Sequence, residues 1–407
     1  MNKRSLLTLA VIVVLAAAPA FASGFGFYEQ GAKASGQAGA WVARADDASA
    51  NWYNPAALVN LTGREVQFGF NYLQPGSDTQ FSPTAAPGVS IDAVSNGVAP
   101  AHFYFSQKIN DRIAWGVGLN SPFGLVSEWD SPVVTQFSKR AELRTYLLNP
   151  NIAFKMGHYW SVAFGADYIT TEIREFSQEF DFGPLGVPAS PVTANLTGEG
   201  DAWGYNFALQ FKNEYFSIAG QYRSALRNKI DGNITVTPPF DVFNSAATAY
   251  LDLPGQTMLG MAWTGKRVDI EVGAYYTQWN YFKSLDIETG NPLTSLSQSE
   301  YWEGTWSWRL GAAFRLGKEM KNELRVGVVF DETPIPTQYL RPSIPDSDRT
   351  GYTLGYGYLS KRWGIDLYAM YLDFNSVTAT GVPTDNVIPG TYTTKIWLAG
   401  VTAKYRF

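Results

Sequence analysis

The chain contains no cysteine among its 407 residues and only two histidines. The absence of cysteine excludes a disulfide framework and thiol chemistry. Charged residues make up 16% of the chain, compared with roughly 25% in an average soluble domain. The net charge of −5 gives no sign of the positively charged surface that nucleic-acid binding needs. The chain is therefore poor in the residues on which soluble enzymes and nucleic-acid-binding proteins depend.

Long apolar runs are also missing after the first 22 residues. Within those residues, Lys3 and Arg4 precede an apolar stretch over residues 6–18, and residues 20–22 have the A-x-A form of a cleavage site. The stretch is too short to span a membrane comfortably. We expect a signal peptide over residues 1–22, which leaves a mature chain of 407 − 22 = 385 residues. Without a second apolar run, a membrane-spanning structure has to be a β-barrel.

Catalytic and metal-binding residues are scarce as well. A hydrolase needs a nucleophile with a general base, but His158 lies in a predicted turn and His102 stands alone on a predicted strand. No G-x-S-x-G motif lies near either histidine. Asp46 and Asp47 are interpreted as a helix cap or a polar contact rather than a cation site. We expect no enzymatic activity, no cofactor and no metal.

The sequence is rich in aromatic residues, with 13 Trp, 23 Tyr and 25 Phe. From Arg64 onward, apolar and polar residues alternate with a period of two. In the segment 300–317 the predicted apolar face consists of Trp302, Trp306, Trp308, Leu310, Ala312, Phe314 and Leu316. This alternation is typical of transmembrane strands with aromatic girdles. A soluble β-sandwich is disfavoured because its exposed face would carry too many aromatic residues.

The pattern predicts an all-β fold, a transmembrane antiparallel barrel of about fourteen strands over residues 64–407. The strands are expected near residues 64–74, 98–109, 112–121, 141–156, 159–178, 201–212, 214–230, 248–264, 267–282, 300–317, 322–332, 350–361, 363–374 and 392–407. Short turns should face the periplasm and long loops the exterior. The C-terminal strand ends in Phe407, the kind of ending that outer-membrane assembly machinery reads. We expect a monomer in the bacterial outer membrane, in contact with lipid and lipopolysaccharide.

The segment from Ser23 to Gly63 precedes this pattern and is crowded with Gly, Ala and Ser. It ends in the turn Asn54-Pro55-Ala56, where Asn54 is expected to bond its own turn and Pro55 to fix φ. Its aromatic residues need burial, which an exposed tail would not supply. We therefore predict an N-terminal hatch, or plug, over residues 23–63 inside the lumen.

Several predicted lumen faces are apolar, unlike those of a water-filled porin. The apolar lumen positions are Tyr275, Tyr368, Met370, Leu372, Phe374, Ile396 and Leu398. These side chains either pack against the plug or line a path for a hydrophobic ligand. The polar residues assigned to the lumen are Arg174, Arg223, Arg325, Glu323 and Glu271. Most are interpreted as interior ion pairs, and one or two as partners of a carboxylate headgroup.

Four motifs, in order along nearly the whole mature chain, resemble the FadL–TodX family of outer-membrane fatty-acid and hydrocarbon transporters. They are Ser23-Gly24-Phe25; Ala45-Asp46-Asp47-Ala48 leading to Asn54-Pro55-Ala56; Ser121-Pro122-Phe123-Gly124-Leu125 with Glu128; and Asp331-x-x-Pro334 followed by Ile344-Pro345-Asp346-Ser347-Asp348-Arg349. Each motif alone is weak, whereas the set is strong.

The resemblance implies a route for a hydrophobic ligand. A capture groove is expected near residues 122–140 and 179–200, with Leu125, Val126, Trp129, Phe137, Phe180, Phe182 and Leu185. Phe25 would touch an inner pocket, and a hatch rearrangement would open a lateral exit at Ser121, Pro122, Phe123 and Gly124. Pro and Gly suit such a gap because both weaken strand pairing. Arg174, and then Arg223, best match the family's carboxylate-binding cations.

The sequence therefore predicts the uptake of long-chain fatty acids or of aromatic or aliphatic hydrocarbons. The alternative is a general or substrate-specific porin for small polar solutes. The predicted plug and the apolar lumen positions argue against that alternative.

Overall fold

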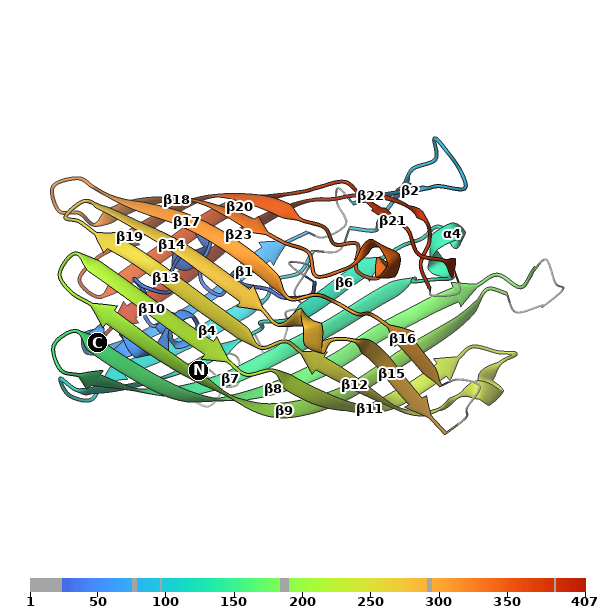
Figure 1. The fold of residues 1–407 in the computed structure, drawn as a ribbon, viewed down its shortest axis with the longest axis horizontal. Helices are drawn as coiled ribbons and strands as arrows, with labels where there is room; N and C mark the ends of the chain where they lie inside the picture. Colours follow the sequence, from blue (N-terminus) through green and yellow to red (C-terminus); the bar gives the residue numbers. More distant parts are fainter. Residues whose placement is uncertain (1–23, 75–78, 96, 184–189, 291–294, 384–385) are drawn as a thin grey trace, which may run out of the picture.

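The computed structural model describes residues 24–74, 79–95, 97–183, 190–290, 295–383 and 386–407. These residues form a closed antiparallel barrel of fourteen crossing strands, elongated along the barrel axis (Figure 1). The barrel closes where β1 (Arg64–Leu73) pairs with both β23 (Lys395–Arg406) and β4 (Ala101–Lys108). One end of the barrel carries short turns and the other carries long loops. None of the helices in the described residues is long and apolar enough to cross a membrane.

The other crossing strands follow the chain order around the barrel. They are β5 (Ile113–Asn120), β7 (Arg140–Met156), β8 (Trp160–Phe180), β9 (Val192–Lys212), β10 (Phe216–Arg223) continued by β11 (Leu226–Val236), β12 (Ser245–Leu253) continued by β13 (Gln256–Thr264), β14 (Val268–Thr277), β17 (Thr305–Leu316), β18 (Asn322–Asp331), β19 (Arg349–Leu359) and β20 (Trp363–Phe374). The short strand β6 (Gly124–Glu128) continues β5 after a break, and the hairpin of β15 (Ser284–Thr289) and β16 (Leu296–Ser299) extends the wall at the long-loop end. The fold predicted from the sequence is confirmed.

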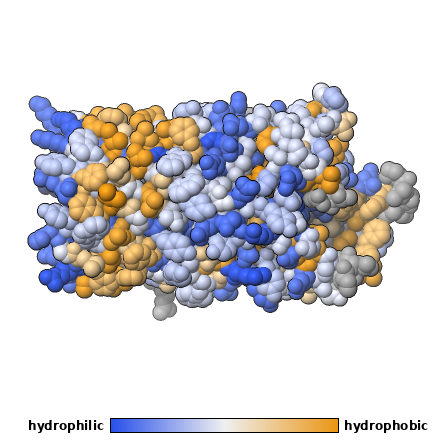
Figure 2. All heavy atoms as spheres, in the orientation of Figure 1, coloured by the Kyte–Doolittle hydropathy of each residue, from blue (hydrophilic) through white to orange (hydrophobic). Residues whose placement is uncertain are grey.

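The strands form because their side chains alternate between two different environments. In β20, Trp363, Ile365 and Leu367 are exposed on the outside, whereas Tyr368 and Met370 are buried inside. Figure 2 shows a band of apolar side chains across the visible face of the barrel near the short-turn end, with polar side chains at its borders. Such a band matches the lipid-facing surface of a membrane barrel.

The N-terminal segment, residues 24–63, lies inside the barrel (Figure 1). Three short helical pieces, α2 (Ala32–Ser35), α3 (Ala50–Tyr53) and η1 (Pro55–Asn60), contact the inner faces of the strands. Its small residues allow close packing against glycines of the wall. A Cβ atom at Gly311 or Gly327 would lie within 2.8 Å of Gln37, and one at Gly355 would lie 2.8 Å from the Cα of Gly36.

Charged groups fix this segment to the barrel wall. Arg44 pairs with Asp269, and the Glu271 carboxylate accepts hydrogen bonds from the backbone N–H groups of Ala43 and Arg44 at 2.7 and 3.0 Å. Lys404 lies 2.8 Å from Asp366 and 3.5 Å from Asp47. All of these side chains are buried. These buried charges are therefore compensated by opposite charges or by backbone N–H groups, as burial requires.

A second, small sheet lies beyond the wall at the long-loop end. It contains β2 (Gln80–Pro83), β3 (Ile91–Asp92), β21 (Val377–Ala379) and β22 (Gly390–Thr393). Phe81 of β2 stacks on Tyr392 of β22, with ring centroids 4.6 Å apart. The remaining helical turns also lie in connections: α4 (Pro132–Thr135), η3 (Asp241–Phe243), η4 (Trp279–Tyr281) and η5 (Thr337–Tyr339).

Candidate functional site

An interior cavity of about 380 Å³ lies in the half of the barrel that carries the long loops. Its lining comes mainly from β7, β8, β9, β11, β12 and the β15–β16 hairpin. The apolar lining includes Leu125, Leu143, Leu196, Ile234, Leu251 and Ile287. Gln178, Gln298 and Asn386 contribute neutral amides, and Phe25 of the N-terminal segment also lines the cavity. The volume and the apolar lining suit a small-molecule site.

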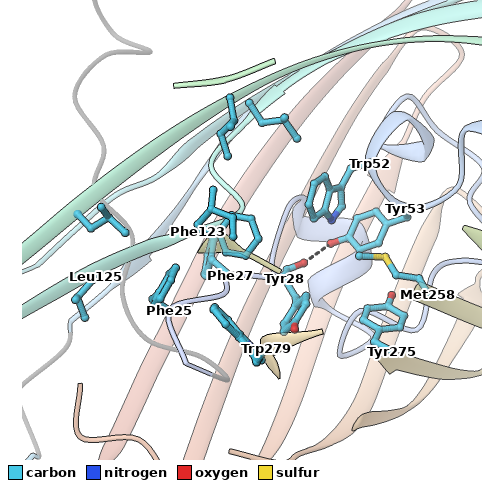
Figure 3. Packing of buried hydrophobic residues seen from close by; sticks show 14 of the residues in the cluster. Phe25, Phe27, Tyr28, Trp52, Tyr53, Phe123, Leu125, Met258, Tyr275 and Trp279 are labelled. Carbon is cyan, nitrogen blue, oxygen red and sulfur yellow. Dashed lines mark hydrogen bonds between the residues drawn. The ribbon is translucent and has the colours of Figure 1, made fainter. Parts of the chain in front are cut away.

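Phe25 connects this cavity to the N-terminal segment. Its ring is 2% exposed and contacts a group of aromatic rings from the wall (Figure 3). The centroid distances are 4.7 Å to Trp279, 5.6 Å to Trp302, 5.8 Å to Phe282 and 6.1 Å to Phe123. Edge-on aromatic contacts of this kind add to the free energy gained by burial.

The barrel wall is interrupted beside Phe25. Between β5 and β6, residues 121–122 leave the strand conformation, and Phe123 forms an isolated antiparallel bridge with Gly26 of the N-terminal segment. The Phe27 N–H donates to the Pro122 carbonyl and the Gly124 N–H donates to the Phe25 carbonyl, both at 2.8 Å. On its other side, β6 pairs with β7. Residues 25–27 therefore take the place of a neighbouring strand at the break.

Asp346 also holds the start of the N-terminal segment in this position. The Gly24 N–H donates to the Asp346 carboxylate at 2.8 Å, and the Thr333 hydroxyl donates to the same oxygen at 2.8 Å. Asp346 belongs to a loop, and burial raises the pKa of its carboxyl to about 6. Deeper in the segment, the Tyr53 hydroxyl donates to the Tyr28 carbonyl at 2.8 Å (Figure 3).

The turn at Asn54 has the expected geometry. Its side-chain oxygen accepts a hydrogen bond from the Ala56 N–H at 3.1 Å, and its amide donates to the Val42 carbonyl at 2.8 Å. Pro55 occupies the first position of η1, where its fixed φ suits a helix start. Asn54 thus joins two parts of the N-terminal segment as well as capping one turn.

The residues predicted to bind ligand lie in several different parts of the structure. Phe25, Leu125 and Phe137 line the cavity, whereas Val126 and Trp129 are buried outside its lining. The Trp129 indole donates to the Pro342 carbonyl at 2.9 Å. The remaining predicted apolar residues also lie outside the cavity lining: Phe180, Phe182, Tyr368, Met370, Ile396 and Leu398. Leu185 lies outside the described residues.

The two predicted headgroup cations differ in position. Arg223 is buried in the lumen, where it pairs with Asp167 and lies over the ring of Trp52 at 4.4 Å. The assignment of Arg174 to the lumen was wrong. Its side chain is 44% exposed on the outer face of β8 and faces Glu172 at 3.5 Å. This part of the outer face lies beyond the apolar band, where polar residues face water.

Sequence reasoning missed most of the cavity wall. Leu143, Leu196, Leu251 and Ile287 were not selected, although each is buried and apolar on an inward face. Alternation in the sequence identifies inward positions, but it does not show which of them converge. Trp302 was also misplaced on a lipid-facing strand, because β17 begins only at Thr305 and Trp302 packs inside on Phe25.

A second cavity of about 270 Å³ lies near the short-turn end and is polar. Its charged lining consists of Lys33, Asp46, Glu65, Lys212 and Arg406. Lys33 pairs with Asp46, and Arg406 with Glu65. No group of three or more metal-ligating side chains occurs within the part of the chain that the structure describes.

These features define an outer-membrane β-barrel whose lumen is occupied by its own N-terminal segment beside an apolar cavity. The chain belongs to the family of outer membrane transport proteins described as OMPP1/FadL/TodX, whose model matches residues 13–407. The family consists of transport proteins rather than enzymes.

Relatives and solved structures extend this result along the full chain. A long-chain fatty acid transport protein of Salmonella typhi is 26% identical over 455 residues and covers 100% of both chains. The protein of the same name from Escherichia coli K12 is 26% identical over 460 residues, again with 100% coverage of both. A Pseudomonas aeruginosa FadL homologue has a TM-score of 0.82 at 22% identity, covering 94% of this chain and 100% of its own. The Pseudomonas putida toluene transporter TodX has a TM-score of 0.70 at 14% identity, with 94% and 99% coverage.

Proposed function

We propose that the protein takes up hydrophobic compounds, either long-chain fatty acids or aromatic or aliphatic hydrocarbons, across the outer membrane. The observation that carries the proposal is the apolar cavity beside Phe25, whose backbone is bonded to the break in the wall at residues 122–124. Relatives named as fatty acid and toluene transporters support both substrate classes.

The route begins among the long loops, which face the exterior in barrels of this kind. A ligand enters the cavity and packs against Phe25 and the leucines of the wall. Residues 24–28 then move away from the break, and the N-terminal segment, hinged near Asn54, acts as the hatch. The ligand leaves sideways into the bilayer through the gap at residues 121–124.

Lateral exit is favoured by the hydrophobic effect. Burial of apolar surface contributes roughly 25 cal/mol per Å², which a ligand would lose on entering the aqueous periplasm. A gap in the wall lets the ligand pass from an apolar cavity directly to lipid. The gap can open with little loss of strand pairing, because among the described residues two backbone bonds, of Phe27 and Gly124, and one bond from the Gln30 side-chain amide to the Ser121 carbonyl close it on this side.

A reversible cross-link tests this movement. Gly26 and Phe123 face each other as a non-hydrogen-bonded antiparallel pair. Such pairs have Cα atoms about 4.5 Å apart, within the range of a disulfide. Because the chain has no native cysteine, the double variant Gly26→Cys/Phe123→Cys would form one defined bond. We expect the oxidised form to lose uptake of labelled oleate and of toluene, and reduction to restore it.

The matched control links two strands of the small sheet, with Ser82→Cys and Thr391→Cys, which are paired across β2 and β22. This cross-link should leave uptake unchanged. Normal uptake by the oxidised Gly26–Phe123 protein would show that the segment does not need to move, and the proposed route would be wrong.

A further inference from the structure

The cavity lining has two ionisable side chains among the described residues, Arg140 and Glu300. Arg140 has no free positive charge to offer, because its guanidinium lies 2.7 Å from Glu142 and 3.5 Å from Glu175 and also pairs with Glu128. Three carboxylates therefore face this guanidinium, and one of them, Glu142, also pairs with Arg144 at 2.6 Å, so the carboxylates still outnumber the guanidinium groups. An anionic ligand approaching Arg140 would meet an excess of negative charge.

Glu300 is 5% exposed and lies at the other side of the cavity. One of its oxygens accepts hydrogen bonds from Arg341 at 2.7 Å and from the Trp302 indole at 3.0 Å. Its other oxygen accepts a hydrogen bond from the Gln298 amide at 2.8 Å. The Arg341 guanidinium also donates to the Ser299 carbonyl at 2.6 Å. Glu300 thus neutralises the cation that lies behind this side of the cavity.

The rest of the polar lining is uncharged. Gln178 and Asn386 bond to each other at 3.3 Å, and both donate to the Phe137 carbonyl. Residues 184–189, 291–294 and 384–385, which lie outside the described chain, contain no lysine or arginine in the sequence. A buried carboxylate would lose its hydration here without gaining a counterion, which is unfavourable. A hydroxyl or carbonyl group loses much less and can bond to an amide.

Resting on the proposed function, we infer that the cavity selects uncharged hydrophobic molecules over carboxylates, and that Glu300 determines this selectivity by neutralising Arg341. The ligand class is a hydrocarbon chain or ring that ends in nothing more polar than a hydroxyl, ester or similar neutral group.

Two ligands of equal chain length test the inference, 1-dodecanol and laurate. The full mature protein in nanodiscs is titrated at pH 8, where an alkyl carboxyl with a pKa of about 4 to 5 is charged. Trp279 and Trp302, which contact Phe25, provide the fluorescence signal. We expect dodecanol to bind at least tenfold more tightly than laurate. Equal or tighter binding of laurate would overturn the inference, whereas no binding of either ligand would refute the proposed function itself.

Variants separate the role of Glu300 from general packing. Glu300→Gln keeps the shape and removes the negative charge that faces Arg341, so laurate should bind at least tenfold more tightly while the affinity for dodecanol changes less than threefold. Unchanged laurate binding would show that Glu300 does not set the selectivity. The double variant Glu300→Gln/Arg341→Met has no cation, and laurate should bind as weakly as in the natural protein. If the single variant does not fold, the titration of the natural protein with dodecanol and laurate still tests the selectivity of the cavity. Glu303→Gln, an exposed position in the same loop, is the matched control.

Discussion

Replacement of Phe25 by alanine should release the N-terminal segment from the wall break. Phe25 is almost fully buried and contacts four aromatic rings. A buried Phe→Ala change costs about 3–5 kcal/mol. If that energy opposes displacement of residues 24–28, the displaced state becomes more populated by between about 10² and 10⁴-fold, since 1.36 kcal/mol is a factor of ten. Because the neighbouring rings can relax into the space that Phe25 leaves, the larger of these two changes in population is an upper limit.

Amide hydrogen exchange measures this change directly. The amides of Phe27 and Gly124 close the break, so both should exchange at least a hundredfold faster in Phe25→Ala, a factor that corresponds to about 3 kcal/mol. The amide of Asn54, which bonds within the segment, should keep its rate. Phe81→Ala removes an equally buried ring from the small sheet and should leave the Phe27 amide protected. Unchanged exchange at Phe27 and Gly124 in Phe25→Ala would refute the role of Phe25 as the anchor.

Three other perturbations give distinct expectations. Asn54→Ala loses a turn-capping bond of about 1 kcal/mol and the bond to the Val42 carbonyl. Uptake should therefore fall, while heat-modified gel mobility still shows a folded barrel. Normal uptake would show that Asn54 contributes packing alone. Asp167→Asn leaves Arg223 buried without its counterion, which should lower the free energy of unfolding by about 3–5 kcal/mol, and an unchanged denaturation midpoint would contradict this. Because burial raises the pKa of Asp346 from 3.8 to about 6, its stabilising contribution is complete below pH 4 and is lost as the pH rises through 6. Asp346→Asn should therefore remove part of the fall in melting temperature between pH 4 and pH 7, and an identical fall in both proteins would exclude this effect.

The barrel could be predicted because a membrane imposes a simple rule on each strand. In β20 and β23 the lipid-facing residues are apolar and every second residue faces inward, so Met370 and Leu398 were assigned to the correct face. The same rule failed for Arg174, because polar side chains also face outward where a strand extends beyond the apolar band. A polar residue therefore indicates a lumen-facing position only in the part of a strand that lies within the lipid.

The candidate site could be predicted only in part. Phe25 and Leu125 belong to motifs that a single sequence displays, and both line the cavity. Leu196 and Leu251 have no such signal, because their meeting depends on how distant strands curve around the N-terminal segment. The ion pair between Glu300 and Arg341 spans two loops, and no spacing in the sequence indicates it.

The small sheet at the long-loop end affects how the barrel closes. Its strand β2 follows the first crossing strand, and its partner β22 precedes the last, so the pair Gln80 and Thr393 is separated by 393 − 80 = 313 positions. The β2–β22 pairing therefore brings together two segments that lie next to the first and the last crossing strand. Once formed, this pairing holds the junction of β1 and β23 together at a second place, outside the lipid. A barrel that opened along the junction of β1 and β23 would have to break the β2–β22 pairing as well.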